Sequence, residues 1–293
     1  MSKKKVLFII NPISGGTNKE GLYKLIEDFC NENSFEYNLL KTTGKQDSQS
    51  IRQEIDTFNP SLVVAGGGDG TIKLVAEELL GTTIKLGILP LGSANGLATE
   101  LGIPEDWKTN LALLNESKFK KIDAIRVNGE LCLHLSDVGF NADLIKEFEE
   151  EGTRGKLGYA ISFVKQLSKR KKSTFQIKID GESYSYKAEM IVLANASKYG
   201  TGAVVNPRCD MQDGLLEVCV FMPLPWHKFF HLTWHSFIGR LEESEYFAIH
   251  QGKDVTITSK KSRTLQVDGE VIGKTKEVKA EVLKGALEIV VPA

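Results

Sequence analysis

The stretch AGGGDGT, Ala65 to Thr71, follows directly on the apolar run SLVV and constrains the fold more than any other segment. The apolar run, the glycine-rich turn and the following IKLVAEELL together predict a buried strand, a tight turn and a helix. A tight turn alone needs one or two glycines, whereas four glycines also allow a ligand to approach the backbone closely. Because a helix N-terminus presents N–H groups and favours negative charge, phosphate is the ligand that this loop predicts.

The same alternation of short apolar strands and helix-period stretches runs through the first part of the chain. It predicts a parallel sheet, whose ligands bind in the loops after the strands. From about Ile122 the pattern changes to alternating strands, with a hairpin signal at Asp180-Gly181 and helical stretches around GKLGYAISFVKQLSKRKK and PWHKFFHLTWHSFI. We therefore predict an α/β domain over residues 1–122 and a mostly antiparallel β-rich domain over residues 123–293.

Composition excludes several classes of function. The 37 Lys and Arg residues nearly balance the 38 Asp and Glu residues, so no global field favours nucleic acid. The four cysteines form no CxxC pair, which is typical of a reducing compartment. No apolar run approaches the roughly 20 residues that span a bilayer. We expect a cytoplasmic protein, and peripheral contact with the inner membrane face is left open.

Five motifs occur in an order that resembles one known family. NPISGG, GGGDGT, LGILPLGSANGLATELGIP, YGTGAVVNPRCDMQDGLLEV and VDGE are similar in order and spacing to the catalytic domains of diacylglycerol kinases and sphingosine kinases, most of all to the bacterial lipid kinases. The resemblance covers nearly the whole chain. It implies an ATP-dependent kinase of a lipid hydroxyl, with a C-terminal β-sandwich and the nucleotide bound in the cleft between the domains.

Phosphoryl transfer requires groups that hold the phosphates, a divalent cation and a base near the attacking hydroxyl. The glycine loop supplies the first, together with the neighbouring NPISGG loop, and the resemblance adds two further nucleotide contacts. The predicted nucleotide-binding residues are Asn11, Ser14, Gly15, Thr42, Gly67, Gly68, Gly70, Thr71 and Ser93. Thr43 is the alternative to Thr42.

Two acids compete for the role of general base. Glu270 follows Asp268-Gly269 in VDGE, and the resemblance implies that it acts from the lipid-binding domain. Asp69 lies in the glycine loop and is either the base, a ligand of the nucleotide's Mg²⁺, or simply a helix N-cap. A Glu after a DG turn is also commonly a solvent-facing residue of a hairpin.

A second Mg²⁺ site is implied by the resemblance in NPRCDMQDGLLEV. Its ligands would be the Asp213 carboxylate and the backbone oxygens of Asp210 and Leu215, which are donors that hard cations prefer. The competing interpretation is an ordinary DG turn before a strand.

The sequence departs from the family in two places. Lys73-Leu74 replaces an Asn-Glu pair that many relatives carry, and Gly96 replaces an aspartate that most bacterial relatives carry after the asparagine. That aspartate is associated with the magnesium network, so its loss puts the usual metal arrangement in doubt.

Two segments are candidates for membrane contact with a lipid substrate. The first is a basic cluster, which is also typical of a solvated helix end, and the second is an aromatic stretch, which is also typical of a core helix. Their residues are Lys165, Lys169, Arg170, Lys171 and Lys172, and Trp226, Phe229, Phe230, Trp234 and Phe237.

Two other functions remain open at this point. One is a kinase of a soluble substrate, similar to NAD kinase, and the other is a non-catalytic sensor of nucleotide or lipid. The sequence predicts neither the lipid nor the oligomeric state.

Overall fold

The computed structural model describes residues 3–16, 18–115, 118–139, 172–198 and 204–292. The chain divides into two compact units, Met1–Ile122 with Gly285–Ala293, and Asp123–Lys284. The last nine residues thus belong to the first unit, whereas the sequence pattern placed them in the second domain. The reason is a long-range pairing, because Ile289 lies opposite Leu86 in a parallel ladder.

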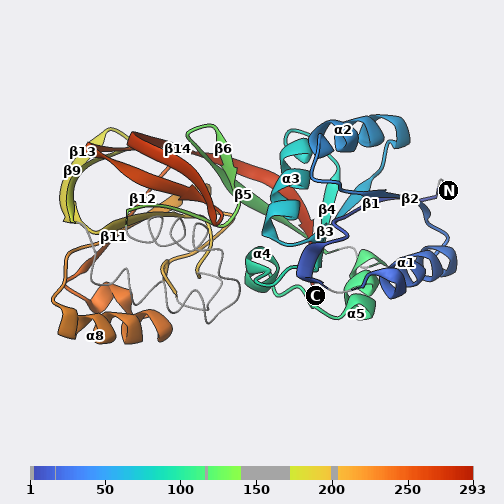
Figure 1. The fold of residues 1–293 in the computed structure, drawn as a ribbon, viewed down its shortest axis with the longest axis horizontal. Coiled ribbons are helices and arrows are strands. Elements are labelled where there is room, and N and C mark those ends of the chain that lie inside the picture. The colour runs from blue at the N-terminus through green and yellow to red at the C-terminus, as the bar shows by residue number, and fades with distance from the viewer. Residues whose placement is uncertain (1–2, 17, 116–117, 140–171, 199–203, 293) are drawn as a thin grey trace. The chain divides into compact units, whose positions relative to one another are not determined.

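The first unit is a parallel sheet with helices on both faces (Figure 1). Its strands run in the order β4-β3-β1-β2, and the end of β14 (Glu270–Val290) pairs with the other side of β4. The strands are β1 (Lys5–Ile10), β2 (Glu36–Lys41), β3 (Leu62–Gly67) and β4 (Lys85–Pro90). The helices are α1 (Glu20–Glu32), α2 (Asp47–Phe58), α3 (Asp69–Leu79), α4 (Gly96–Glu100) and α5 (Trp107–Ala112), with 3₁₀ turns η1 (Ser14–Gly16) and η2 (Leu113–Asn115).

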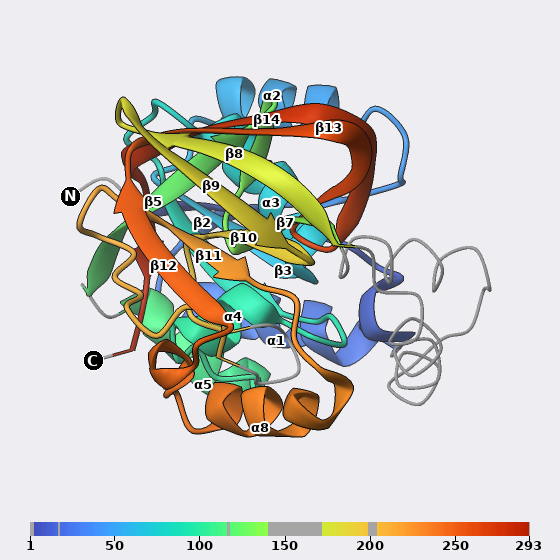
Figure 2. The ribbon, with the colours of Figure 1, turned by 90° about the vertical axis from the view of Figure 1, so that its left-hand side faces the viewer.

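Burial explains why these strands read as continuous apolar runs. All six residues of β3 are buried, as are residues 6–10 of β1, because helices cover both faces of the sheet. Figures 1 and 2 show α2 and α3 on one face and α1 and α5 on the other. The apolar positions of α1, such as Leu22 and Ile26, pack against Phe8 in the core.

The second unit is a β-sandwich whose pairings are antiparallel (Figure 2). Strands β12-β11-β10-β7-β13-β14 lie side by side in that order, and β8 with β9 and β5 with β6 extend from β13 and β14. The strands are β5 (Phe119–Val127), β6 (Glu130–Cys132), β7 (Leu135–Gly139), β8 (Ser173–Ile179), β9 (Glu182–Ala188), β10 (Met190–Ala194), β11 (Leu216–Phe221), β12 (Phe247–Gly252) and β13 (Asp254–Val267). The remaining elements are α8 (Trp226–Phe237) and η3 (Leu241–Glu243).

The fold class predicted from the sequence is confirmed. The Asp180-Gly181 hairpin joins β8 and β9, and both residues have positive φ, 47° and 97°, as a two-residue hairpin turn requires. In β8 the buried Phe175, Ile177 and Ile179 alternate with exposed residues, which accounts for the strand pattern in the sequence.

Candidate functional site

Three loops meet at the carboxyl ends of β1, β3 and β4. These strands are neighbours and parallel, so their ends lie at the same edge of the sheet. Between β3 and α3 the chain needs a single connecting residue, Gly68, which is the N-cap of α3 in an extended conformation. The amides of Thr71 and Ile72 donate to the Gly68 carbonyl at 2.9 and 3.1 Å, which leaves those of Asp69 and Gly70 at the open end of the helix in the part of the chain described.

The first loop is bound tightly to the glycine loop. The Asn11 amide donates to the Gly66 carbonyl at 2.8 Å, and the Asn11 side-chain Nδ2 donates to the Thr71 hydroxyl at 3.2 Å. Gly15 has φ +66°, and a Cβ there would lie 2.3 Å from the Leu91 carbonyl oxygen of the third loop. Asn11, Gly15 and Thr71 therefore fix the loops to one another.

The third loop follows β4 and packs against the glycine loop. A Cβ on Gly92 would lie 2.5 Å from the Gly68 Cα, so Gly92 itself cannot carry a side chain at this contact. The Asn95 side chain holds the turn, because its Oδ1 accepts from the Gly92 amide at 2.8 Å. Ser93 is exposed on this turn.

Asp69 caps a different helix from the one that it begins. It is the first residue of α3, whose N-cap is Gly68, and its two carboxylate oxygens accept from the Gly96 and Leu97 amides of α4 at 2.9 and 3.1 Å. The N-cap interpretation for its own helix is therefore wrong. Gly96, which departs from the family pattern, supplies one of these amides. The Asp69 carboxylate therefore connects the glycine loop to the third loop.

Packing explains Gly67 but does not explain Gly68. A Cβ on Gly67 would overlap the Thr71 side chain at 2.3 Å, so Gly67 is needed for folding. A Cβ on Gly68 would make only ordinary contacts, 3.4 Å to the Gly92 Cα and 3.8 Å to the Ser14 Oγ, and its φ of −89° suits any residue. The missing side chain of Gly68 thus leaves open the space between the first and third loops.

The structure distinguishes the two threonines after β2. The Thr43 hydroxyl donates to Asp47 Oδ1 at 3.1 Å and the Thr43 amide donates to the same oxygen at 2.8 Å, so this side chain is used at the start of α2. Thr42 follows β2 directly, and its amide donates to the Ile10 carbonyl at 3.0 Å at the end of β1. Thr42 is therefore the better candidate of the two.

Sequence reasoning missed Lys19. This lysine is 3 % exposed, and its Nζ donates to the Ser14 carbonyl at 2.7 Å, directly beneath the NPISGG loop. Burial lowers the pKa of Lys19. A lysine eight residues after Asn11 carries no signal that separates it from the exposed Lys24 of the following helix α1, so only the fold reveals its position.

Glu270 is exposed at the start of β14, on a strongly braced turn. Asp268 and Gly269 have φ of 50° and 86°, and Val267 pairs with Glu270 across the turn. The Asp268 carboxylate accepts from the amides of Leu133, His134 and Leu135 at 2.8 to 3.1 Å. The aspartate of the VDGE motif therefore holds the turn, and the glutamate is presented outward.

The predicted magnesium loop at residues 210–215 uses its carboxylates locally. Asp210 Oδ1 accepts from the Gln212 amide at 3.0 Å and Asp213 Oδ1 accepts from the Leu215 amide at 2.8 Å. The Lys284 ammonium lies 3.5 Å from the Asp213 carbonyl oxygen, and a cation there disfavours a divalent ion. The described residues contain no cluster of three or more His, Cys, Asp or Glu side chains suited to a metal, so magnesium at this loop stays a prediction.

A buried glutamate near this loop was also missed. Glu217 on β11 is 2 % exposed, and it accepts hydrogen bonds from the side chains of Asn206 and Gln251 at 2.5 and 2.9 Å. Burial raises the pKa of Glu217 to about 7, although both hydrogen bonds oppose that shift. In the sequence, Glu217 looks like the solvent-facing polar position of an alternating strand. In the structure, β11 is buried on both faces at this point, so the glutamate is buried as well.

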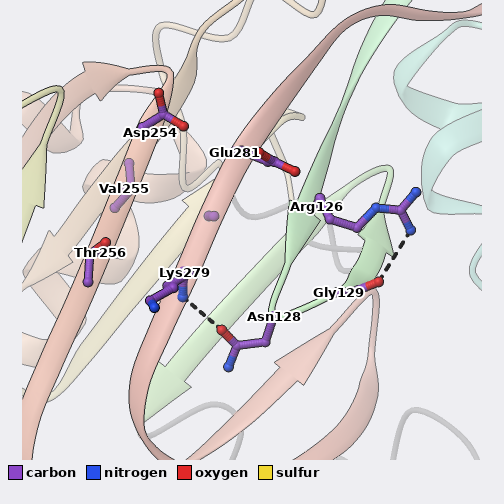
Figure 3. A pocket seen from close by; sticks show the side chains of 9 residues that line it. Arg126, Asn128, Gly129, Asp254, Val255, Thr256, Lys279 and Glu281 are labelled. Atoms are coloured by element: carbon purple, nitrogen blue, oxygen red, sulfur yellow. Dashed lines mark hydrogen bonds between the residues drawn. The ribbon is translucent and has the colours of Figure 1, made fainter.

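The second unit has a hollow of about 440 Å³ on β5, β13 and β14 (Figure 3). Its polar groups bind one another, because Arg126 donates to the Gly129 carbonyl at 3.3 Å and Asn128 accepts from the Lys279 amide at 2.8 Å. Asp254 and Glu281 add negative charge beside the two cations. Because positive and negative side chains both line the hollow, it favours neither an anionic nor a cationic ligand, and we do not assign it to the site.

Comparison with known proteins assigns the family. Residues 5–127 match the diacylglycerol kinase catalytic domain, and residues 137–291 match the YegS C-terminal NAD kinase beta sandwich-like domain. A "Probable lipid kinase YegS" of Salmonella gallinarum is 30 % identical over 86 % of this chain and 85 % of its own length. The chain belongs to the diacylglycerol kinase catalytic-domain family.

A second relative and a solved structure are also similar to this chain over nearly its whole length. A "Probable lipid kinase YegS-like" of Klebsiella pneumoniae is 29 % identical and covers 98 % of this chain and 95 % of its own. The crystal structure of a diacylglycerol kinase from Bacillus anthracis has a TM-score of 0.77 at 19 % identity, over 100 % of this chain and 98 % of that one. At this identity the structure supports the fold alone.

Of the two segments predicted to contact a membrane, the structure describes the aromatic one. Within the described part of the chain, no helix has the length and apolar character needed to cross a bilayer. The basic cluster lies outside the described residues, apart from Lys172. The aromatic stretch forms α8, as the sequence predicted.

Proposed function

We propose that this protein transfers the γ-phosphoryl group of ATP to the hydroxyl of a lipid of the diacylglycerol, phosphatidylglycerol or sphingoid type. The observation that carries the proposal is the bare backbone of Gly68, which the fold itself does not require, at the N-terminus of α3. Amides of the first helical turn and the helix dipole suit a phosphate at that position. Membership in a kinase family supplies the reaction class.

Each residue of the three loops then has a role. Ser14, Gly68, Gly70 and Ser93 face the phosphates, while Asn11 and Thr71 hold the first loop against α3. Asp69 fixes the third loop through α4. Magnesium, when bound with the nucleotide, would offset phosphate charge, and Asp69 is the acid of the glycine loop that the sequence offers as a ligand.

Glu270 is the proposed general base that accepts the proton of the lipid hydroxyl. Its exposure on a turn held by Asp268 suits a group that must meet a substrate from solvent or membrane. Asp69 is less suited, because both of its oxygens already accept backbone hydrogen bonds from α4, which hold the carboxylate in place. Asp69 takes the role if Glu270→Gln is active at near the parent rate.

Incubation with γ-labelled ATP, magnesium and extracted lipids tests the function. Label in the organic phase, identified by mass as a phosphorylated lipid, is the expected result. Label only in a soluble product would favour a kinase similar to NAD kinase. Nucleotide binding without transfer to any lipid over a broad panel would overturn the proposal and favour a non-catalytic sensor.

A further inference from the structure

Among the described side chains of α8, Leu232 and Ser236 are the buried ones. Leu232 lies in an apolar cluster with Cys219 and Phe247, and Ser236 is 8 % exposed. The Ser236 hydroxyl donates to the Val204 carbonyl at 2.6 Å. These two residues are one turn apart and define the face of α8 that meets the protein.

Large apolar side chains are exposed at the C-terminal end of α8. Trp234 is 64 % exposed, Phe237 is 56 % exposed, and Ile238 at the C-cap is 42 % exposed. At 3.6 residues per turn, Trp234 lies roughly 180° from the midpoint of Leu232 and Ser236. A helix on a protein surface normally carries polar residues on its outward face, so an exposed Trp234 departs from the usual pattern.

The charges after α8 are largely paired. Arg240 donates to Glu243 at 2.5 Å and Arg208 binds Glu242, so the chain beyond the helix adds little net charge. The Arg240 amide also donates to the His235 carbonyl at 2.8 Å, which places these pairs beside the C-terminal turn of the helix. Attraction to an ionic partner is therefore weak, and the apolar side chains dominate this face.

The size and composition of the patch indicate its partner. A stable protein–protein interface needs about 800 Å² and 20 to 30 residues on each side. Among the side chains described on α8 and its C-cap, three are large, apolar and exposed, and these three alone fall short of that number. Insertion into the boundary between headgroups and acyl chains needs only a few side chains, and Trp is enriched there.

We propose that Trp234, Phe237 and Ile238 form a docking patch that inserts into the surface of a lipid bilayer. The patch brings the enzyme to the phase that holds its substrate, so this inference rests on the proposed lipid kinase function. Because insertion is apolar, docking does not require anionic lipid and persists at high salt, unlike attraction by a basic cluster.

Flotation with phosphatidylcholine vesicles, at about 0.15 M and about 1 M salt, tests the patch. The parent protein is expected to float at both salt concentrations. The double variant Trp234→Ser/Phe237→Ser is expected to lose at least ~10-fold in partitioning, from the transfer free energy of one aromatic side chain. The control Ile272→Ser removes a single apolar side chain that is 41 % exposed elsewhere in the same unit, and it should float like the parent.

A folded double variant that floats as well as the parent would overturn the proposal, as would a parent that stays in the bottom fraction. Light scattering at the same concentrations adds a second criterion, because a dimer that only the double variant dissociates would assign the patch to a second copy of the chain. Failure of the lipid kinase function is a separate result. A parent protein that floats but phosphorylates no lipid would support the docking patch and contradict the kinase function. A parent protein that phosphorylates detergent-dissolved lipid and never floats would support the kinase function and contradict the docking patch.

Discussion

Replacement of Gly68 by alanine should separate folding from nucleotide binding. The new methyl group would make only van der Waals contacts, at 3.4 Å from Gly92 and 3.8 Å from Ser14, and the backbone is already extended. Folding should therefore be unaffected, or stabilised by about 0.4–1 kcal/mol because the unfolded chain loses freedom. The methyl group nevertheless occupies the space between the first and third loops, where we place a phosphate.

The magnitude follows from the hydrogen bonds that the methyl group would displace. A hydrogen bond to a charged group is worth about 1.5–3 kcal/mol, so the loss of one weakens ATP binding by roughly 10- to 100-fold. Titration calorimetry with ATP and thermal denaturation of the same sample measure both quantities.

Gly67→Ala is the matched comparison for Gly68→Ala. Its Cβ would overlap the Thr71 side chain, which the Asn11 side-chain Nδ2 holds in place, so it should lower stability by about 1–3 kcal/mol. A folded Gly68→Ala variant with parent ATP affinity would remove the glycine loop from the site. A clearly destabilised Gly68→Ala variant would contradict the expectation that the added methyl group makes only van der Waals contacts with Gly92 and Ser14.

Three further results are expected. Glu270→Gln should retain ATP affinity and lose kcat by a factor of roughly 10² or more, while Glu281→Gln on the same strand stays at the parent rate in the same assay. Lys19→Met should raise the KM for ATP by ~10-fold with little change in kcat, because the Ser14 loop loses its buried anchor, and Lys24→Met on the exposed side of α1 should not. Glu217 binds its proton more tightly when folded, so its contribution to stability is complete below pH 4.5 and is lost as the pH rises through about 7, which amounts to roughly 3 kcal/mol. Denaturant unfolding of Glu217→Gln between pH 5 and 7 should show a flatter dependence on pH than the parent, and an equal slope would contradict the assignment.

Local patterns in the sequence determine much of this fold. Strand and helix periods place β1, β3 and α3, and the dipeptide Asp180-Gly181 specifies a hairpin from two residues alone. The glycine loop is recognisable for the same reason, since its composition and the elements on either side are adjacent in the chain.

Contacts between distant residues were not predictable in this way. Asp69 is bound by amides 27 and 28 positions later, and no periodicity indicates which of several acids will cap another helix. Lys19 resembles any surface lysine until the fold buries it. The outward position of Trp234 was equally hidden, because an aromatic stretch predicts a helix without showing which face meets the core.

The return of β14 to the first unit has a consequence for synthesis of the protein. Leu86 on β4 has its β14 partner more than 200 residues later, so the first unit remains an open sheet while the rest of the chain is being translated. An open strand edge can pair with other chains and favours aggregation. Nascent chains that stall before residue 285 should therefore depend on chaperones, and the first unit becomes complete only when residue 290 has left the ribosome.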